Sequence, residues 1–278
     1  MDGHQETNFA FWNARWKQNY VEREQRIRAN PQLDYWDKRA RDFSLMRKSN
    51  DYDFGRKVYA SLQHILSPDA TMLDIGAGPG TFTIPFAQKI KFATAVEPSK
   101  GMVSVLKENA QEAGVHNFTI IEELLQDLPS GNSPAFQFDL VAISLVLWMF
   151  QDVWPRIVQM ESYAKGHCAI VAGIPDRRNP KTANKADVDE FQILCNMLIS
   201  QGRFPNVSII NYQCERTVED EIQCRKIIYE QYEQDMTAEA EEEKIRQEVL
   251  AKAKDGMCLI SSRSAVIWWN PQDIVPVS

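Results

Sequence analysis

Three glycines at alternating positions, with an acidic residue before them, are the strongest chemical signal in the sequence. They lie in the run LDIGAGPGT at residues 73–81. Glycine lets the backbone turn sharply and come close to a ligand, and a helix starting after the run would point its free N–H groups at that ligand. The spacing is GxGxG, whereas dinucleotide-binding folds use GxGxxG to hold a pyrophosphate. Because Asp74 would repel phosphate and favour an ammonium or sulfonium group, the run favours a ligand with an amino-acid moiety.

Two further acidic positions follow at the ends of apolar stretches. The stretch 93–96 ends at Glu97, where a carboxylate can accept hydrogen bonds from both hydroxyls of a ribose. The stretch 120–121 is followed by Glu-Glu-Leu at 122–124, where side chain and backbone can meet an adenine ring. Ligands of open α/β sheets bind at the carboxyl ends of the strands. All three signals therefore lie where a ligand is expected.

In this order the motifs resemble those of the class I S-adenosylmethionine-dependent methyltransferases. Within that class they resemble the small-molecule branch related to the ubiquinone and menaquinone biosynthesis methylases. The stretches that carry the resemblance are LDIGAGPGTFT (73–83, motif I), EPSKGM (97–102, E-P-S-x-x-M in the family), FDLV (138–141) with LWM (147–149) and Asp152, and AKGH (164–167). The last departs from the family's LKPGG turn, because it lacks the proline and has His167 in place of the second glycine. The resemblance covers about residues 55–175.

The resemblance implies S-adenosylmethionine as the cofactor and S-adenosylhomocysteine as its product. The residues expected to contact the cofactor follow the first four strands: Asp74, Gly76, Ala77, Gly78, Gly80, Thr81, Glu97, Pro98, Met102, Glu123, Leu124, Ser144 and Leu145. The three glycines would line the methionine part, and Asp74 would orient its amino group. Glu97 would hold the ribose.

The adenine and the reacting methyl group would lie further along the same edge. Pro98 and Met102 would flank the adenine, and residues 123–124 would meet its edge, although they depart from the family's usual Asp-Ala pair. Residues 144–145 would lie near the sulfonium and the transferred methyl. No residue stands out as a general base, which is needed only if the acceptor must lose a proton. The catalytic residues therefore stay unassigned.

Four aromatic residues are candidates for the acceptor pocket. Trp148 occupies a position where relatives often have His or Gln facing the acceptor, and it could shape an aromatic or apolar pocket. The alternative is a core tryptophan at the start of a helix. Tyr35, Trp36 and Tyr52 could cover the cofactor, as in relatives whose N-terminal helices form a lid, or could merely attach those helices to the sheet.

The elements that must position these residues alternate from residue 71 onward. Apolar runs that predict strands are separated by helical segments, at 71–75, 92–96, 118–121, 138–144 and 168–173. This alternation predicts βαβ units and a parallel sheet. A strand at 207–212, helices at 218–234 and 238–254, and closing apolar runs at 257–260 and 264–269 predict an antiparallel edge. We therefore expect a Rossmann-like α/β fold with a seven-stranded, mostly parallel sheet, an antiparallel last strand and helices on both faces.

The first 55 residues differ from the rest because they are charged and rich in aromatic side chains. Helices are expected at 8–29, 33–47 and 53–66. We interpret residues 1–55 as an N-terminal helical cap or lid, and residues 56–278 as a methyltransferase domain with a helical insertion around 176–204. Because cap and insertion can both close over the active-site end of the sheet, they favour a small-molecule acceptor.

Composition excludes several other classes. The formal net charge of −7 disfavours a nucleic-acid binder, because phosphate binding needs clustered basic side chains. The basic stretches 15–28 and 38–48 also carry acidic residues, which indicates solvated helix faces. The five cysteines form no CxxC pair, so we expect reduced thiols and no metal site. The longest apolar stretch, 140–150, is too short to span a membrane, and no secretory signal is evident, so cytoplasmic residence is expected.

Two alternatives to a small-molecule methyltransferase stay open. A protein or RNA acceptor would be indicated by a basic stripe around the mouth of the site, and an enclosed apolar pocket would count against it. A non-catalytic cofactor-binding or scaffold protein could keep the same fold, because fold does not fix function. The oligomeric state stays open between monomer and homodimer.

Overall fold

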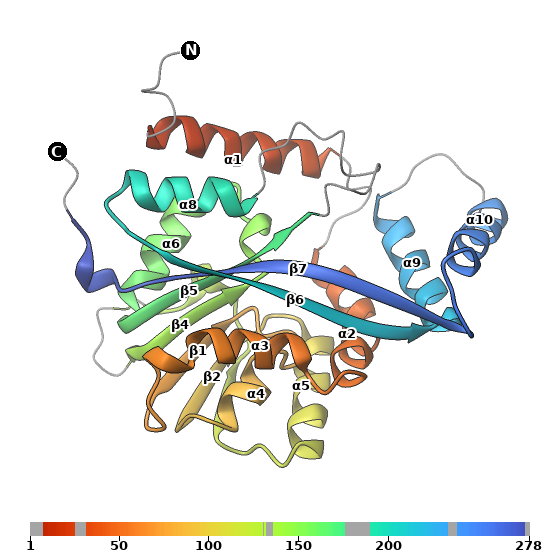
Figure 1. Ribbon diagram of the computed structural model, residues 1–278, viewed down its shortest axis with the longest axis horizontal. Helices are drawn as coiled ribbons and strands as arrows, with labels where there is room; N and C mark the ends of the chain where they lie inside the picture. The colour runs from red at the N-terminus through yellow and green to blue at the C-terminus, as the bar shows by residue number, and fades with distance from the viewer. Residues whose placement is uncertain are drawn as a thin grey trace.

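The computed structural model describes residues 8–25, 32–129, 131, 136–175, 190–232 and 238–275. Within these residues, seven strands form one sheet in the order β3-β2-β1-β4-β5-β7-β6 (Figure 1). The strands are β1 (Thr71–Ile75), β2 (Phe92–Val96), β3 (Phe118–Ile121), β4 (Phe138–Ser144), β5 (Ala164–Ile174), β6 (Asn206–Thr217) and β7 (Met257–Trp269). The predicted fold class is confirmed, and the first four strands have the predicted bounds.

The pairing of the strands creates a crevice at the centre of the sheet. β1 pairs in parallel with β2 on one side and with β4 on the other. The chain therefore runs outward from β1 to β3 and then returns to start β4 beside β1. The carboxyl ends of β1 and β4 form the topological switch point at which sheets of this kind bind ligands. β7 runs antiparallel to both β5 and β6, as predicted.

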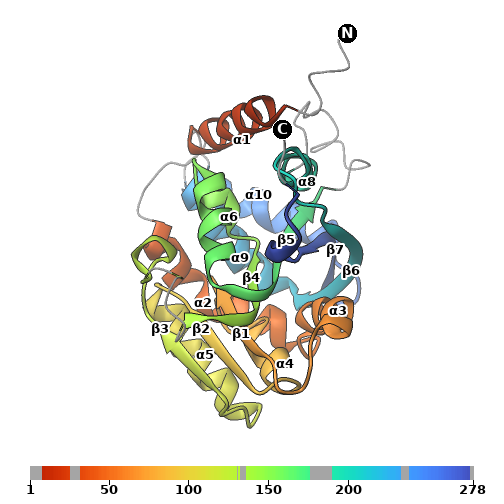
Figure 2. The ribbon, with the colours of Figure 1, turned by 90° about the vertical axis from the view of Figure 1, so that its left-hand side faces the viewer.

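Helices cover both faces of the sheet (Figures 1 and 2). The helices are α1 (Phe9–Glu24), α2 (Gln32–Lys48), α3 (Asp53–Leu62), α4 (Thr83–Ala87), α5 (Lys100–Glu112), α6 (Val153–Ser162), α8 (Glu190–Ser200), α9 (Val218–Tyr232) and α10 (Ala238–Leu250). Alternate residues of β4 face opposite cores. Leu140 and Ala142 pack against α3 and α4, whereas Val141 and Ile143 pack on the side of α1, α6 and α8.

Several elements differ in length from the sequence prediction. β5, β6 and β7 are longer than the apolar runs that predicted them, and the two closing runs are one continuous strand. In residues 213–217 of β6 exposed and buried positions alternate, and the buried ones include Arg216, so no continuous apolar run marks this part of the strand. The predicted helix at 53–66 ends as α-helix at Leu62 and continues as a short 3₁₀ turn. Residues 26–29 and 176–189, expected in the first helix and in the insertion, lie outside the described residues.

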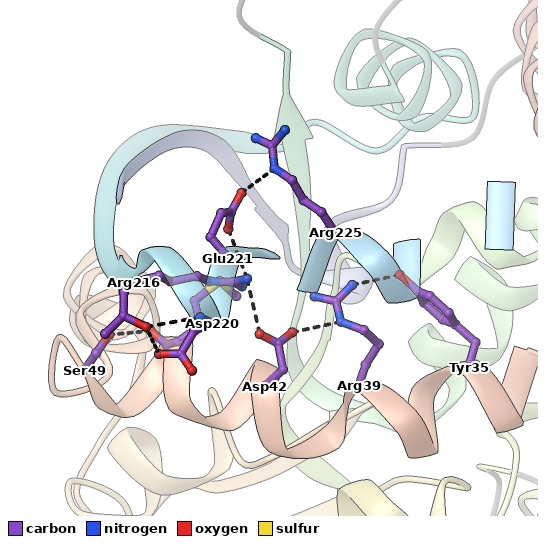
Figure 3. Close-up of polar contacts among 10 residues, drawn as sticks. Tyr35, Arg39, Asp42, Ser49, Arg216, Asp220, Glu221 and Arg225 are labelled. Atoms are coloured by element: carbon purple, nitrogen blue, oxygen red, sulfur yellow. Dashed lines mark hydrogen bonds and ion pairs between the residues drawn. The ribbon is translucent and has the colours of Figure 1, made fainter. Parts of the chain in front are cut away.

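The outer halves of β6 and β7, with α9 and α10, form an arm that packs against α2 (Figure 1). A network of ion pairs joins the two (Figure 3). On α2, Asp42 bridges Arg39, at 2.9 Å, and Arg216 of β6, at 3.2 Å. Arg216 also pairs with Glu221 of α9, which in turn pairs with Arg225. Because these groups are largely buried, the network fixes α2 against the arm. The division of the chain at residue 55 stays a prediction.

The prediction that residues 38–48 form a solvated helix face is wrong in part. Arg39 and Arg47 are only 6% and 5% exposed. Both face inward on α2, where the arm and α3 cover them, whereas Arg41 on the opposite side of the helix is exposed. None of the described helices is long and apolar enough to cross a membrane.

Candidate functional site

A cavity of about 710 Å³ lies beyond the ends of β1, β2 and β4. One wall follows these three strands, and α2 and α3 supply the wall opposite. Every residue predicted to contact the cofactor lines the cavity except Gly80: Asp74, Gly76, Ala77, Gly78, Thr81, Glu97, Pro98, Met102, Glu123, Leu124, Ser144 and Leu145. The structure therefore brings the separate sequence signals together in one site.

The glycine loop after β1 makes the sharp turn that the sequence predicted, with positive φ at Gly76, Gly78 and Gly80. Its glycines have different roles. Gly78 has φ +56°, and a Cβ atom built there meets no atom within 4 Å, so the loop faces open space in the cavity. Gly80 has φ +91°, but a Cβ atom there would meet Leu106 at 2.5 Å and Ile84 at 2.8 Å. The prediction that Gly80 lines the ligand is wrong, because this residue allows α4 and α5 to pack closely.

Asp74 is almost completely buried at the end of β1, yet it borders the cavity. Its carboxylate accepts hydrogen bonds from the backbone N–H of Thr83 at 3.0 Å and from its hydroxyl at 2.6 Å. Burial raises the pKa of Asp74 to about 6, and the charge of nearby Glu97 adds to the rise. Asp74 thus fixes the start of α4 and places a titratable carboxyl group beside the glycine loop.

Glu97 joins two motifs that are separate in sequence. One carboxylate oxygen accepts the N–H of Gly78 at 2.8 Å, and the other accepts the N–H of Ser99 at 2.9 Å. Burial raises the pKa of Glu97. The side chain is 7% exposed and lines the cavity, so its carboxylate can also meet the hydroxyls of a ribose. Glu97 therefore holds the glycine loop against the end of β2.

The segment after β4 is held by α1. Leu145 has a positive φ of +55°, and its carbonyl accepts a hydrogen bond from the indole N–H of Trp148 at 2.7 Å. Arg23 of α1 donates to the Trp148 carbonyl at 2.7 Å, and Trp16 donates to the carbonyl of Phe150 at 2.8 Å. Trp148 lines the cavity and is only partly buried, so it is not the core tryptophan of the alternative interpretation.

Of the three N-terminal candidates, only Trp36 is among the described residues that line the cavity. The prediction of Tyr35 and Tyr52 as pocket residues is wrong. The Tyr35 hydroxyl accepts a hydrogen bond from Arg39 at 2.8 Å, which places it in the α2 network (Figure 3). Tyr52 has φ +56° just before α3 and packs against the core that α4 and α5 form with the sheet. Both residues attach the N-terminal helices, as the alternative interpretation proposed.

Sequence reasoning missed the main residues of the helical wall. Phe43 and Arg47 of α2 and Phe54 of α3 line the cavity, together with Phe82 before α4. A signal for the α2 residues exists in the sequence. Positions 36, 40, 43 and 47 recur at helical spacing and share one face.

Residues 72–161 match the model of a protein family described as a methyltransferase domain. An uncharacterized protein of Haemophilus influenzae is 29% identical over 92 residues, 33% of this chain and 34% of that protein. The uncharacterized methyltransferase YcgJ of Bacillus subtilis is 33% identical over 82 residues, 30% of this chain and 31% of YcgJ. The 23S rRNA (uracil(1939)-C(5))-methyltransferase RlmD of Xanthomonas euvesicatoria is 42% identical over 50 residues, 18% of this chain and 11% of RlmD. The matches thus span about a third or less of these curated relatives.

The crystal structure of YcgJ matches with a TM-score of 0.51 at 18% identity, covering 80% of this chain and 98% of YcgJ. At this identity the likeness shows the fold. The region matched by the family runs from β1 through most of α6, and it contains the strand ends that form the sheet side of the cavity. The predicted resemblance is therefore confirmed at the level of domain and fold. Residues 72–161 match a methyltransferase domain, and the chain shares its fold with YcgJ.

Proposed function

We propose that this protein binds S-adenosylmethionine at the ends of β1, β2 and β4 and transfers its methyl group to a small-molecule acceptor. One observation carries the proposal: a single cavity of about 710 Å³ joins Asp74, Gly78 and Glu97 to an aromatic wall on α2 and α3. Cavities of roughly 300–1,000 Å³ are typical of sites for small ligands and cofactors. The volume supports a cofactor and a small acceptor side by side.

The groups on the sheet wall suit the parts of the cofactor in order. The open space beside Gly78 suits the methionine chain, and the carboxyl group of Asp74 suits its ammonium group. Glu97 suits the ribose hydroxyls, and Met102 with Leu124 offers apolar contacts for the adenine. The sulfonium would then lie toward Ser144, on the side of the cavity that Trp148 borders.

The reaction is an in-line displacement. A lone pair of the acceptor forms a bond to the methyl carbon, the bond from that carbon to sulfur breaks, and the sulfur keeps the electron pair as the thioether of S-adenosylhomocysteine. Because the sulfonium is already a good electrophile, the protein's main contribution is to align the acceptor and exclude water. The aromatic wall and the loop that α1 holds over Trp148 serve this purpose. An acceptor that carries a proton at the reacting atom must also lose it, and the group that takes the proton is unassigned.

A small-molecule acceptor is favoured over RNA or protein by the chemistry of the cavity wall. Its helical side consists largely of buried aromatic side chains rather than exposed basic ones, and the chain carries a net charge of −7. The likeness to RlmD covers 11% of that protein and does not extend to a substrate. Membership of the ubiquinone-type branch, cytoplasmic residence and the monomeric or dimeric state remain predictions.

Two measurements test the proposal. Calorimetric titration with S-adenosylmethionine and S-adenosylhomocysteine is expected to give one site per chain, and absence of binding to either would leave only a scaffold role. Methyl transfer is then followed with S-adenosylmethionine labelled in its methyl group, using small-molecule, protein and RNA fractions of a cell extract as acceptors. Label is expected in the small-molecule fraction. Label confined to protein or RNA would overturn the acceptor class while leaving the cofactor site intact.

A further inference from the structure

The helical wall of the cavity contains a buried arginine that no carboxylate among the described residues neutralises. Arg47 lies near the end of α2, lines the cavity and is only 5% exposed. No hydrogen-bond partner reaches its Nε atom, and none of the described carboxylates forms an ion pair with it. An arginine stays protonated in proteins, and an unpaired charge is costly to bury. The described residues therefore supply no anionic partner for Arg47.

Two other arginines at α2 pair with carboxylates, although the Nε atom of Arg216, like that of Arg47, has no hydrogen-bond partner. Arg39 pairs with Asp42 at 2.9 Å, and Arg216, which packs on α2, pairs with both Asp42 and Glu221 (Figure 3). Arg47 lies two turns beyond Arg39 and borders the cavity rather than the arm. Within the described part of the chain, carboxylates therefore pair with the arginines that hold α2 in place, and none pairs with Arg47, which borders the cavity.

Aromatic rings surround Arg47 instead. The guanidinium carbon lies 4.7 Å from the ring centre of Phe43, 4.9 Å from that of Phe54 and 5.8 Å from that of Tyr212. Aromatic faces attract a cation and hold the guanidinium plane in position, but they do not satisfy its N–H donors. Burial lowers the pKa of Arg47, and the groups that oppose this fall include Tyr212 and Cys214, neither of which is a carboxylic acid. The side-chain hydrogen bond to Tyr212 occupies one of its donors, and none of the described carboxylates pairs with the guanidinium.

We propose that Arg47 binds the carboxylate of a ligand in this cavity. A planar guanidinium matches a carboxylate with two parallel hydrogen bonds, which is the pairing of highest geometric specificity available to it. The inference rests on the proposed function and adds a ligand group to it. Two sources could supply the carboxylate: the amino-acid end of the cofactor, or an acidic acceptor.

The position of Arg47 favours the amino-acid end of the cofactor. The Phe54 ring beside it lies 5.5 Å from the ring of Phe82, and Phe82 directly precedes Thr83, the residue that Asp74 holds. The cavity thus presents an anion at Asp74 and a cation at Arg47. A zwitterion, with its ammonium and carboxylate on one carbon, matches this pair of charges.

The test compares two ligands that differ in the group concerned. S-adenosylhomocysteine carries the carboxylate, and 5′-methylthioadenosine lacks the whole amino-acid end. Both are titrated calorimetrically into wild type, Arg47→Met, Arg47→Lys and the control Arg41→Met, which changes an exposed arginine of the same helix. We expect Arg47→Met to lower the affinity for S-adenosylhomocysteine by about tenfold or more. The affinity for 5′-methylthioadenosine should change by less than about twofold. We expect Arg47→Lys to fall between, because it keeps the charge and loses the planar fork.

The remaining outcomes separate the two sources and the two proposals. If Arg47→Met leaves the affinity for S-adenosylhomocysteine unchanged, benzoate is titrated into protein that is saturated with S-adenosylhomocysteine. If wild type binds benzoate and Arg47→Met does not, the carboxylate that Arg47 binds belongs to the acceptor. If Arg47→Met and Arg47→Lys lower the affinities for both adenosine ligands equally, Arg47 only packs the wall. This result would overturn the proposal. Wild-type affinities throughout, with no Arg47-dependent benzoate site, would do the same. Failure of wild type to bind either adenosine ligand would instead contradict the proposed function.

Discussion

The two walls of the cavity are built in different ways. On the sheet wall, Asp74, Gly78 and Glu97 lie within a short stretch of chain and are held by hydrogen bonds to nearby backbone, such as that between Gly78 and Glu97 at 2.8 Å. On the helical wall, Arg47 and its aromatic neighbours depend on contacts with the distant arm, including the 3.2 Å ion pair between Asp42 and Arg216. The first wall is a backbone structure that presents a few fixed polar groups. The second is a side-chain structure whose shape depends on packing.

This difference suggests a division of labour. A wall made of backbone and short polar side chains suits a ligand that is always the same, such as the cofactor. A wall of aromatic side chains on packed helices can be reshaped by substitution without disturbing the strands. Changes on the sheet wall should therefore have the larger effects on cofactor affinity, and those on the helical network should act mainly on stability.

Replacement of Gly78 by valine is expected to have the largest effect on cofactor affinity. The residue has φ +56°, where a β-branched side chain is strained by on the order of 1–3 kcal/mol. The new side chain would also fill the open space beside the loop, so we expect calorimetry to show a loss of more than about a hundredfold in affinity. Gly114→Val is the matched control, since Gly114 has φ +64° and open space around it but lies outside the described cavity lining. Equal losses in the two variants would mean that strain alone causes the effect.

Glu97→Gln is expected to lower the affinity for the cofactor by roughly 10- to 100-fold, because losing a charged hydrogen bond costs about 1.5–3 kcal/mol. Both carboxylate oxygens accept backbone N–H groups, so the amide would direct its NH₂ at one of these donors. Titration calorimetry measures the affinity, and Glu243→Gln on the exposed face of α10 serves as the control. Unchanged affinity in Glu97→Gln would mean that the second motif is not part of the cofactor site.

The titration of Asp74 should make cofactor binding depend on pH. Because an ammonium group prefers the ionised carboxylate, affinity for S-adenosylhomocysteine is expected to rise by up to about tenfold between pH 5 and pH 7, around the pKa of about 6. Asp74→Asn should flatten this profile, whereas Asp69→Asn on an exposed turn should not. A wild-type affinity that is constant over this range would remove Asp74 from contact with a charged ligand group.

The same titration has the opposite effect on the ligand-free protein. The pKa of Asp74 is raised from 3.8 to about 6 on folding, so the folded state binds the proton more tightly. Its contribution to stability is fully present below about pH 4 and is lost as the pH rises through about 6, on the order of 3 kcal/mol in all. Urea unfolding of wild type and Asp74→Asn across this range measures the difference in pH dependence.

Asp42→Asn should have the smallest effect on the cofactor and a clear effect on stability. It leaves Arg39 and Arg216 without their shared charge, and breaking a buried pair costs about 3–5 kcal/mol. Cofactor affinity should change by less than about threefold, because Asp42 pairs with Arg39 and Arg216 rather than with a residue of the sheet wall. Asp34→Asn, which removes an exposed pair with Lys38 on the same helix, should cost at most about 0.5 kcal/mol in urea unfolding. A large loss of cofactor affinity in Asp42→Asn would mean that the two walls are coupled.

The same contrast explains what the sequence could predict. Asp74 and Glu97 were predictable because Asp74 lies near the end of a short apolar strand and Glu97 directly follows one, and β1 to β4 have the predicted bounds because such strands are local patterns. Gly80 was misassigned because the GxGxG pattern treats three glycines alike, although the third one's freedom serves helix packing.

The helical wall could not be predicted from local pattern alone. Tyr35 and Tyr52 share the aromatic character of Trp36, but they lie on other faces, which only the packing of α2 and α3 decides. Arg47 stands in a charged helix that resembles a solvated one, and its burial depends on Phe54 and Tyr212. These contacts join residues far apart in the chain, so no local pattern contains them.

The attachment of α2 to the arm also has a consequence for biosynthesis. Met46 on α2 contacts Arg216 across a separation of 170 residues. Chains are made from the N-terminus, and their parts can begin to fold before synthesis ends. The strands that carry the glycine loop and Glu97 are complete before β6 emerges, so Asp42 and its helix acquire their partner only late in translation. The helical wall of the cavity therefore gains its support from the arm only after the chain segments of the sheet wall have been translated.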